Sequence, residues 1–319
     1  MATMGVLEPE VVAAIDDLGL AARRVVEGLR AGEHRSPFHG FNHEFSQYRE
    51  YRPGDDLKYL DWKALGRTDR LYTRLFLETT NMAVVFVVDA SASMGFPVAG
   101  DSSGAPAGGS AGVSKLRYAS VMTAALAHLL IGSGDAAGLL ALSDRNTTWL
   151  PARGGRAHLQ HLLQRLARLE PGGAWQPQRA LRRAAELLRR RGLLVVLSDF
   201  YDDEDATFAE LKRCAARGHE VAMLHVLSRP ELELPYDGPL EFTDMEGNAR
   251  RLTEPAKVRD AYRERIAAFC EGWRQRATAA GIDYQRLVTD EPPSTALRQY
   301  LVRREIAAGH THTHPHRKR

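Results

Sequence analysis

The chain of 319 residues is 44% hydrophobic and 26% charged, proportions that are ordinary for a folded globular protein with a substantial core. Its net charge of +3 is small and its basic residues are clustered locally, so we exclude nucleic acid as a partner, which would require a broad basic face. No apolar run approaches the roughly 20 residues that cross a bilayer, and the acidic amino terminus does not resemble a secretion signal, so we expect no membrane span and a cytoplasmic protein.

The amino-terminal part of the chain divides into a helix and a segment of unusual composition. Apolar residues recur at helical spacing from Pro9 to Arg30, which predicts an amphipathic helix that covers one side of the domain. From Gly32 to Glu78 aromatic, charged, Gly and Pro residues are crowded together. Within this segment Asp55 and Asp56 favour a short helical turn, and the partial alternation from Arg70 to Glu78 predicts a strand.

The stretch from Ala83 to Met94 predicts the central strand of the fold. Its run of apolar, largely β-branched residues without alternation is typical of a strand buried on both faces of a parallel sheet. It ends in Asp89, Ser91 and Ser93, whose hard oxygen atoms follow the carboxyl end of the strand, where open α/β sheets place their binding sites. We therefore expect a Mg²⁺ site here. The alternative is that the three residues only form the turn after the strand, since all are good turn formers.

The next elements are an insertion, a buried helix and an edge hairpin. The composition from Gly95 to Gly112, rich in Gly, Ser, Ala and Pro, predicts a flexible insertion. Ser114 is the expected cap of a helix whose residues Leu116 to Ile131 are apolar on nearly all sides, so this helix should pack against the sheet. Asp135 to Leu142 and Thr147 to Leu150 predict a second core strand and a short edge strand, joined as a hairpin.

A second acidic strand end lies further along the chain. Two helices are expected, from Gly155 to Leu169 and from Gln176 to Arg191, and the strand from Leu193 to Leu197 then repeats the apolar pattern of the first strand. It is followed by Ser198-Asp199-Phe200. Asp199 is the second acidic residue that a metal site at this edge of the sheet requires.

The remaining elements continue the alternation of helices and strands. Their expected ranges are a helix from Asp202 to Arg217, a strand from Glu220 to Leu227, a β-hairpin turning near Gly247-Asn248, a helix from Glu254 to Ala280, a strand from Ile282 to Val288 and a helix from Pro293 to Ile306. This order implies an α/β fold: a doubly wound, mostly parallel sheet with right-handed crossovers, helices on both faces and a small accessory β segment.

These elements divide the chain into segments. They are an N-terminal helix (1–31), a segment rich in Arg, Asp and aromatic residues (32–80), an α/β core (81–229, with a flexible insertion at 98–113), a β-hairpin (230–253), C-terminal helices with the last strand (254–308) and a disordered tail rich in His and basic residues (309–319).

Two motifs carry a resemblance to a known family. D-A-S-A-S-M after the first core strand, together with L-S-D-F after a later one, resembles the metal-ion-dependent adhesion site of von Willebrand factor A domains. The preceding R-E-Y-R-P-G-D-D-L-K-Y-L-D-W-K-A-L-G-R, from Arg49 to Arg67, resembles the signature of a bacterial branch, the domain of unknown function fifty-eight. The resemblance runs from about Gly32 to about Arg303. It implies a Rossmann-like doubly wound sheet in a non-enzymatic interaction protein, an adaptor to a MoxR-type AAA+ ATPase that acts as a chaperone on client proteins.

The resemblance also implies how the site is used. Ser91 and Ser93 would bind Mg²⁺ directly, Asp89 and Asp199 would act largely through water, and a carboxylate of the partner would fill the open position. The sequence departs from the family pattern at one ligand, a threonine that usually comes from a G-G-T-like loop between the second and third helices. This chain has Gly172-Gly173-Ala174 there, and because Ala174 offers no hydroxyl, a water would have to take its place.

The segment from Arg49 to Arg67 has two interpretations. In the structural one, its charged residues form ion pairs and its aromatic residues pack, which holds an irregular segment in place. In the functional one, the segment is a docking surface for the partner. The residues of the docking interpretation are Arg49, Arg52, Asp55, Asp56, Asp61, Trp62 and Arg67.

No catalytic arrangement is evident, because the sequence contains no G-x-S-x-G elbow, no P-loop and no H-E-x-x-H. The two cysteines, Cys214 and Cys270, fit neither a disulfide framework nor a zinc spacing. Two alternatives to a metal-dependent interaction module remain open. One is a metal-dependent hydrolase of phosphate esters, since two acidic strand ends and a cation also suit that chemistry. The other is a metal-free scaffold that uses the segment from Arg49 to Arg67 alone.

Overall fold

The computed structural model of the chain describes residues 17–31, 47–50, 66, 71–75, 82–97, 112–144, 147–188, 190–201, 203–247 and 249–311. The chain divides into two compact units. One comprises Met1–His34 and Met82–Arg319, and the other comprises Arg35–Asn81.

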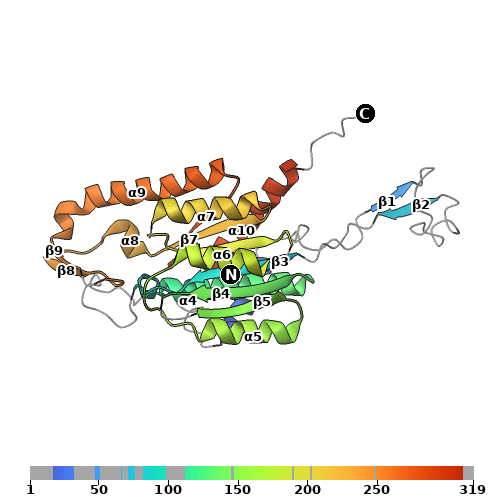
Figure 1. Cartoon of the computed structure of the whole chain (residues 1–319), viewed down its shortest axis with the longest axis horizontal. Helices are drawn as coiled ribbons and strands as arrows, with labels where there is room; N and C mark the ends of the chain where they lie inside the picture. Colours follow the sequence, from blue (N-terminus) through green and yellow to red (C-terminus); the bar gives the residue numbers. More distant parts are fainter. Residues whose placement is uncertain are drawn as a thin grey trace, which may run out of the picture. The chain divides into compact units, whose positions relative to one another are not determined.

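The larger unit is built on a six-stranded sheet of described residues, with the order β10-β7-β6-β3-β4-β5 (Figure 1). Neighbouring strands are parallel except β4 and β5, which are antiparallel. The strands are β3 (Ala83–Asp89), β4 (Ala136–Leu142), β5 (Thr147–Arg153), β6 (Leu193–Ser198), β7 (Glu220–Leu227) and β10 (Asp283–Val288). The mostly parallel α/β sheet expected from the sequence is confirmed.

The chain starts this sheet at β3 and winds outward from it in both directions. β4 and β5 follow on one side of β3, whereas β6, β7 and β10 follow on the other. The topological switch point therefore lies between β3 and β6, which pair in register with Val88 opposite Leu197. Doubly wound sheets bind their ligands in the crevice outside the carboxyl ends of the strands at this point. Here those ends lead into Asp89 and Asp199.

Helices cover both faces of the sheet. Their bounds are α2 (Leu18–Ala31), α4 (Lys115–Gly132), α5 (Arg156–Ala167), α6 (Pro177–Leu187), α7 (Glu204–Ala216), α9 (Pro255–Ala279) and α10 (Pro293–Thr311). Val85 and Val87 of β3 belong to a hydrophobic cluster with residues of α6, α7 and α9, and α7 lies next to α9 (Figure 1). Because successive side chains of a strand point to opposite faces, Phe86 faces the other side, where α4 packs on β3. Burial on both faces explains why the strand shows no alternation.

Helix α4 is buried along most of its length, as its uniformly apolar sequence predicts. Ser114 caps it, because the Ser114 hydroxyl accepts the backbone N–H of Arg117 at 3.3 Å. Helices α2, α5 and α10 pack against α4. The predicted N-terminal helix is thus present from Leu18 onward, and residues 9–16 of the prediction lie outside the described part. No helix of the described residues has an apolar stretch long enough to cross a membrane.

The segment between β7 and α9, together with the start of α9, forms an accessory layer. Helix α8 (Arg229–Glu233) is followed by the hairpin of β8 (Leu240–Thr243) and β9 (Arg250–Thr253). The sequence predicts this hairpin but not α8, since it assigns residues 230–253 to the hairpin alone. The helix begins there because the Ser228 hydroxyl and the Glu231 carboxylate form a reciprocal capping box. At the other end of the chain α10 continues to Thr311, into the tail predicted to be disordered from 309, because Ala is the strongest helix former and two alanines precede that boundary.

The smaller unit contains an antiparallel pair of strands among its described residues. β1 (Gln47–Glu50) pairs with β2 (Tyr72–Leu75), and Arg49 lies opposite Thr73. β2 falls within the strand predicted from Arg70 to Glu78. The helical turn expected at Asp55 and Asp56 lies outside the described residues, as do residues 98–111 of the predicted insertion.

Trp273 offers a test of the packing between α9 and the sheet. Its ring is fully buried, with centroids 5.3 Å from Phe200 and 6.3 Å from Phe208. We expect Trp273→Ala to lower the free energy of unfolding by about 3–5 kcal/mol, because it leaves a large cavity in the core. Trp149→Ala, at a half-exposed ring on β5, is the matched control and should cost less than about 1 kcal/mol. Urea denaturation measures both, and equal losses would contradict this packing.

Candidate functional site

The carboxyl ends of β3 and β6 bring a carboxylate and a hydroxyl together. Asp89 ends β3 and Ser198 ends β6, and the Ser198 hydroxyl donates to Asp89 Oδ2 at 2.6 Å. The other carboxylate oxygen, Asp89 Oδ1, accepts the backbone N–H of Ser91 at 2.8 Å and so closes the turn after the strand. Asp89 is fully buried, and both of its carboxylate oxygens have a hydrogen-bond donor.

The turn carries the two serines that the sequence predicts as ligands. Ser91 Oγ and Ser93 Oγ lie 3.1 Å apart, and Ser93 Oγ donates to Asp199 Oδ2 at 2.8 Å. Ser91 is buried, whereas Ser93, at the start of the short helix η3 (Ser93–Gly95), is half-buried. Ser93 therefore joins the two strand ends and keeps part of its surface in contact with solvent.

The backbone after β6 adopts an uncommon conformation. Phe200 has a φ of 52°, in the left-handed region that costs energy for a residue with a bulky side chain. Its ring is buried against His225 and Trp273, with centroids 5.4 and 5.3 Å away. Its backbone N–H donates to Ser198 Oγ at 3.0 Å. These contacts stabilise the turn and thereby position the neighbouring Asp199 carboxylate.

A buried lysine contacts this site from the first turn of α4. Lys115 Nζ donates to Asp199 Oδ2 at 2.6 Å and to Glu231 Oε1 at 2.5 Å. The ammonium also lies 5.2 Å from the centre of the Tyr201 ring, within the range of a cation–π contact. The Lys115 side chain has no exposed surface, and those of Asp199 and Glu231 are 2% and 14% exposed. We call the connected residues Asp89, Ser91, Ser93, Lys115, Asp199 and Glu231 the polar cluster.

The charge of Lys115 is stabilised by its partners and not by its helix. A positive charge at the first position of a helix is unfavourable, because the helix dipole is positive at that end. Burial by itself would lower the pKa of Lys115, but the carboxylates of Asp199 and Glu231 raise it above its ordinary value. Lys115 is therefore a charged, tethered cation between the sheet and α8.

Glu231 is positioned by the capping box of α8. Its second oxygen, Oε2, accepts the backbone N–H of Ser228 at 2.7 Å and the Ser228 hydroxyl at 2.8 Å. The backbone carbonyl of Glu231 accepts the Tyr262 hydroxyl of α9 at 2.7 Å. The carboxylate that meets Lys115 is thus held from two elements of the accessory layer.

Negative charge exceeds positive charge in the polar cluster. It contains the carboxylates of Asp89, Asp199 and Glu231 and the single ammonium of Lys115. Burial, and next to it the charge of Asp199, raises the pKa of Asp89 well above its ordinary value. The cluster therefore favours the binding of additional positive charge near Asp89.

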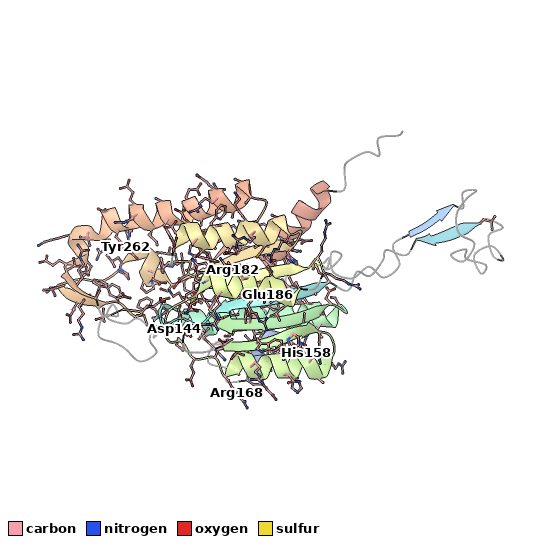
Figure 2. All side chains as sticks on the ribbon, viewed as in Figure 1. Asp144, His158, Arg168, Arg182, Glu186 and Tyr262 are labelled. Atoms are coloured by element: carbon pink, nitrogen blue, oxygen red, sulfur yellow. The ribbon has the colours of Figure 1, made fainter. Side chains whose placement is uncertain are left out.

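The loop that contains Gly172, Gly173 and Ala174 lies against the site. The backbone N–H of Ala92 donates to the carbonyl of Gly173 at 2.8 Å. Asp144, which follows β4 (Figure 2), accepts the backbone N–H of Ala174 on its Oδ1 at 3.0 Å. The departure seen in the sequence is therefore a departure at the site itself, where Ala174 contributes no hydroxyl.

The residues predicted as metal ligands come together, because Asp89, Ser91, Ser93 and Asp199 all belong to the polar cluster. Arg49, predicted as a docking residue, lies in β1 of the smaller unit. The other predicted docking residues lie outside the described part of the chain: Arg52, Asp55, Asp56, Asp61, Trp62 and Arg67. Among the described residues no group of three or more His, Cys, Asp or Glu side chains is arranged to hold a metal ion. A metal here would therefore depend on the serine hydroxyls.

Three residues of the site are not predicted from the sequence. They are Lys115 and Glu231 of the polar cluster and Ser198, whose hydroxyl donates to Asp89. A lysine at the first position of an otherwise apolar helix is a signal, since the helix dipole disfavours it there. The spacing Ser228-x-x-Glu231 is that of a capping box. Neither signal shows that Lys115 and Glu231 meet, because they are 116 residues apart in the chain.

The sheet order and the polar cluster at its switch point define the class of this protein: a doubly wound α/β domain with hydroxyl and carboxylate groups at its binding edge. The family model described as "Protein of unknown function DUF58" matches residues 47–271. The chain belongs to this family, the domain of unknown function fifty-eight that the Arg49–Arg67 signature predicts.

Relatives of the chain occur in mycobacteria, where they carry the description "Uncharacterized protein". Those from Mycobacterium bovis and Mycobacterium tuberculosis are 29% identical over 310 residues, which cover 95% of this chain and 93% of each relative. One from Mycobacterium avium is 33% identical over 147 residues, which cover 45% of this chain and 86% of the relative.

Several solved structures resemble the chain weakly. They include BatB from Bacteroides thetaiotaomicron, with a TM-score of 0.44 and 18% identity over 70% of this chain and 98% of that one. The SpRpn10 VWA domain has a TM-score of 0.39 and 12% identity over 69% and 95% of the two chains. A von Willebrand factor type A structure from Catenulispora acidiphila has a TM-score of 0.39 and 11% identity over 73% and 43%. The fold class rests on the sheet itself.

Removal of the buried ammonium tests whether Lys115 compensates the negative charge of the buried carboxylates in the polar cluster. We expect Lys115→Met, measured by urea denaturation in the presence of a chelator, to lower the free energy of unfolding by about 3–5 kcal/mol, because two buried carboxylates lose their cation. Adding Glu231→Gln to this variant should recover part of the loss. Lys212→Met, at an exposed lysine of α7, is the matched control with little expected effect. If Lys115→Met were as mild as the control, the ammonium would not be the charge that holds this cluster.

Proposed function

We propose that this chain is a non-enzymatic protein-interaction module whose polar cluster binds an acidic group of a partner through Mg²⁺. The observation that carries the proposal is the composition of the cluster, in which the three carboxyl groups of Asp89, Asp199 and Glu231 are accompanied by one ammonium. A partner carboxylate would be repelled by such a site, since like charges repel most strongly where water is excluded. An added cation removes this repulsion.

The donors beside Asp89 suit Mg²⁺. The ion takes octahedral oxygen coordination at about 2.0–2.1 Å, which places neighbouring ligands roughly 3 Å apart. Ser91 Oγ and Ser93 Oγ are 3.1 Å apart. These two hydroxyls would hold the ion, with Asp89 and Asp199 acting through water and a further water in place of the hydroxyl that Ala174 lacks. When bound, Mg²⁺ would supply an open coordination position to a carboxylate.

A metal-free interaction module is the second candidate, and the position of Lys115 favours it. The Lys115 ammonium already contacts Asp199 Oδ2, the same oxygen that accepts the Ser93 hydroxyl. In the metal-free module, the Lys115 ammonium supplies the positive charge beside Asp199 that a metal ion would otherwise supply. Partner binding then depends on other surfaces, including the segment from Arg49 to Arg67.

For the partner, we propose a MoxR-type AAA+ ATPase, with this chain as the adaptor of a chaperone that assembles or activates client proteins. The support for this choice is the resemblance of the Arg49–Arg67 signature to a bacterial branch, which implies a protein that works with such ATPases. The polar cluster would then receive an acidic side chain of the ATPase or of a client.

Mg²⁺ is expected to raise the melting temperature of the wild-type protein relative to a chelator. A ligand that binds only the folded state stabilises it, by about 2.7 kcal/mol at a hundred times its Kd. Ser91→Ala should lose most of this stabilisation because it removes one hydroxyl donor, whereas Ser133→Ala, which replaces the residue after the last turn of α4, should keep it. Scanning calorimetry measures all three. Equal melting temperatures of the wild type in Mg²⁺ and in chelator would contradict the Mg²⁺-dependent form and leave the metal-free one.

Binding to the ATPase is tested in a pull-down with a purified MoxR-type AAA+ ATPase. We expect the wild-type chain to retain the ATPase in a pull-down and Ser91→Ala to retain much less of it at constant Mg²⁺. Varying the protein and not the metal matters, because the ATPase itself uses Mg²⁺ with its nucleotide. No binding by the wild type would refute this choice of partner. Equal binding by both proteins would show that the polar cluster is not the contact.

A further inference from the structure

A pocket of about 550 Å³ adjoins the polar cluster within the larger unit. Its walls come from η3, α8, the β8–β9 hairpin and α9. Mostly apolar side chains line it, including Phe96, Leu234, Phe242 and Val258, and its size is in the range of ligand-binding pockets. Two residues of the polar cluster, Ser93 and Glu231, also line it. We call it the side pocket.

The walls of the side pocket are fastened to α9. The Arg259 guanidinium donates to the carbonyl of Leu234 at 3.0 Å and to the carbonyl of Tyr236 at 2.7 Å. Tyr262, on the end of α9 next to α8 (Figure 2), donates its hydroxyl to the carbonyl of Glu231. Because these bonds hold the segment between α8 and β8 in place, the pocket is largely formed before anything binds, which lowers the entropic cost of binding.

The hairpin presents one face to the pocket and the other to solvent. Phe242 and Arg251 are cross-strand partners and both line the pocket. Since side chains alternate along a strand, Arg250 and Leu252 point to the opposite face, where Leu252 is 74% exposed. Arg250 therefore differs from Arg251 in the direction of its side chain, and on that opposite face its guanidinium lies 3.8 Å from the carboxylate of Glu241.

Positively charged side chains outnumber negatively charged ones in the lining of the side pocket. Arg251 and Arg265 line it, and within the described part of the chain neither forms an ion pair or a side-chain hydrogen bond. Neighbouring arginines of α9 differ in this respect: Arg259 binds Asp237 and Arg263 donates to the carbonyl of Glu233. The one acidic residue among the described lining residues, Glu231, shares the Lys115 ammonium with Asp199. An acidic ligand thus finds two guanidiniums that can bind its carboxylates.

We propose that the side pocket docks a short acidic segment of a protein partner, which inserts one large apolar side chain between Phe242 and Val258 and places flanking carboxylates on Arg251 and Arg265. The inference rests on the proposed role as an interaction module and specifies the partner's chemistry beside the polar cluster. A segment bound here lies next to the half-buried hydroxyl of Ser93, so one partner can cover the pocket and the cluster together.

The probe is a pool of short labelled peptides, each with one Phe, Trp, Leu or Met between aspartates, compared by fluorescence anisotropy with a pool in which lysines replace the aspartates. We expect saturable binding of the acidic pool and little binding of the basic one. Arg251→Glu and Arg265→Glu should each weaken binding by about tenfold or more, because each reverses a charge that meets a carboxylate. Val258→Trp should weaken it similarly by filling the pocket from an exposed position on α9.

Arg250→Glu is the matched control, with the same charge reversal one residue away and on the opposite face, and it should leave binding within about twofold. Equal effects of Arg250→Glu and Arg251→Glu would overturn the proposal in favour of unspecific attraction. Equal binding of both peptide pools, or of neither, would overturn it as well. Ser91→Ala separates it from the proposed function, because Ser91 belongs to the polar cluster but does not line the pocket. If Ser91→Ala binds the acidic pool normally and Mg²⁺ has no effect on stability, docking in the side pocket is supported and the Mg²⁺-dependent function is refuted.

Discussion

The buried ammonium of Lys115 is the interaction on which the rest of this site depends. It joins α4 to the end of β6 through Asp199 and to the accessory layer through Glu231. A charge is removed from water at great cost, which only close opposite charges and hydrogen bonds offset. The three elements therefore have one arrangement in which all these groups are satisfied. A displaced α8 would separate Glu231 from Lys115 and leave the ammonium with Asp199 alone.

The same interaction divides the polar cluster into two parts. On one side Asp199 and Glu231 share the ammonium, so one of their two negative charges is balanced within the protein. On the other side Asp89 is met by hydroxyl and amide groups only, beside the paired hydroxyls of Ser91 and Ser93. An added cation would be attracted most strongly to this second part, because no cation among the described residues contacts Asp89 there. The Mg²⁺-dependent and metal-free forms of the proposed function differ in whether that place is used.

Glu231 connects the cluster to the side pocket. Its carboxylate meets Lys115 on one side, while the residue lines the pocket on the other. In the part of the chain that the structure describes, the pocket is lined by the two arginines Arg251 and Arg265 and by one acid, Glu231, so its net charge is positive and opposite in sign to the excess charge of the cluster. A partner that covers both would carry an acidic segment for the pocket and, at the cluster, a carboxylate that requires a bridging cation.

The sequence by itself determined the sheet and half of the site. The unbroken apolar run of β3, the cap at Ser114 and the acidic ends at Asp89 and Asp199 depend on local chemistry and on the rule that parallel strands end at one edge, so they were predictable. Helix α8 was missed because its capping box is short and lies within a segment otherwise typical of a hairpin. Only the tertiary structure decided that Lys115 meets Glu231 and that Arg251, but not Arg250, faces the side pocket. Contacts between residues so distant in the chain arise from packing of whole elements, and no local pattern encodes them.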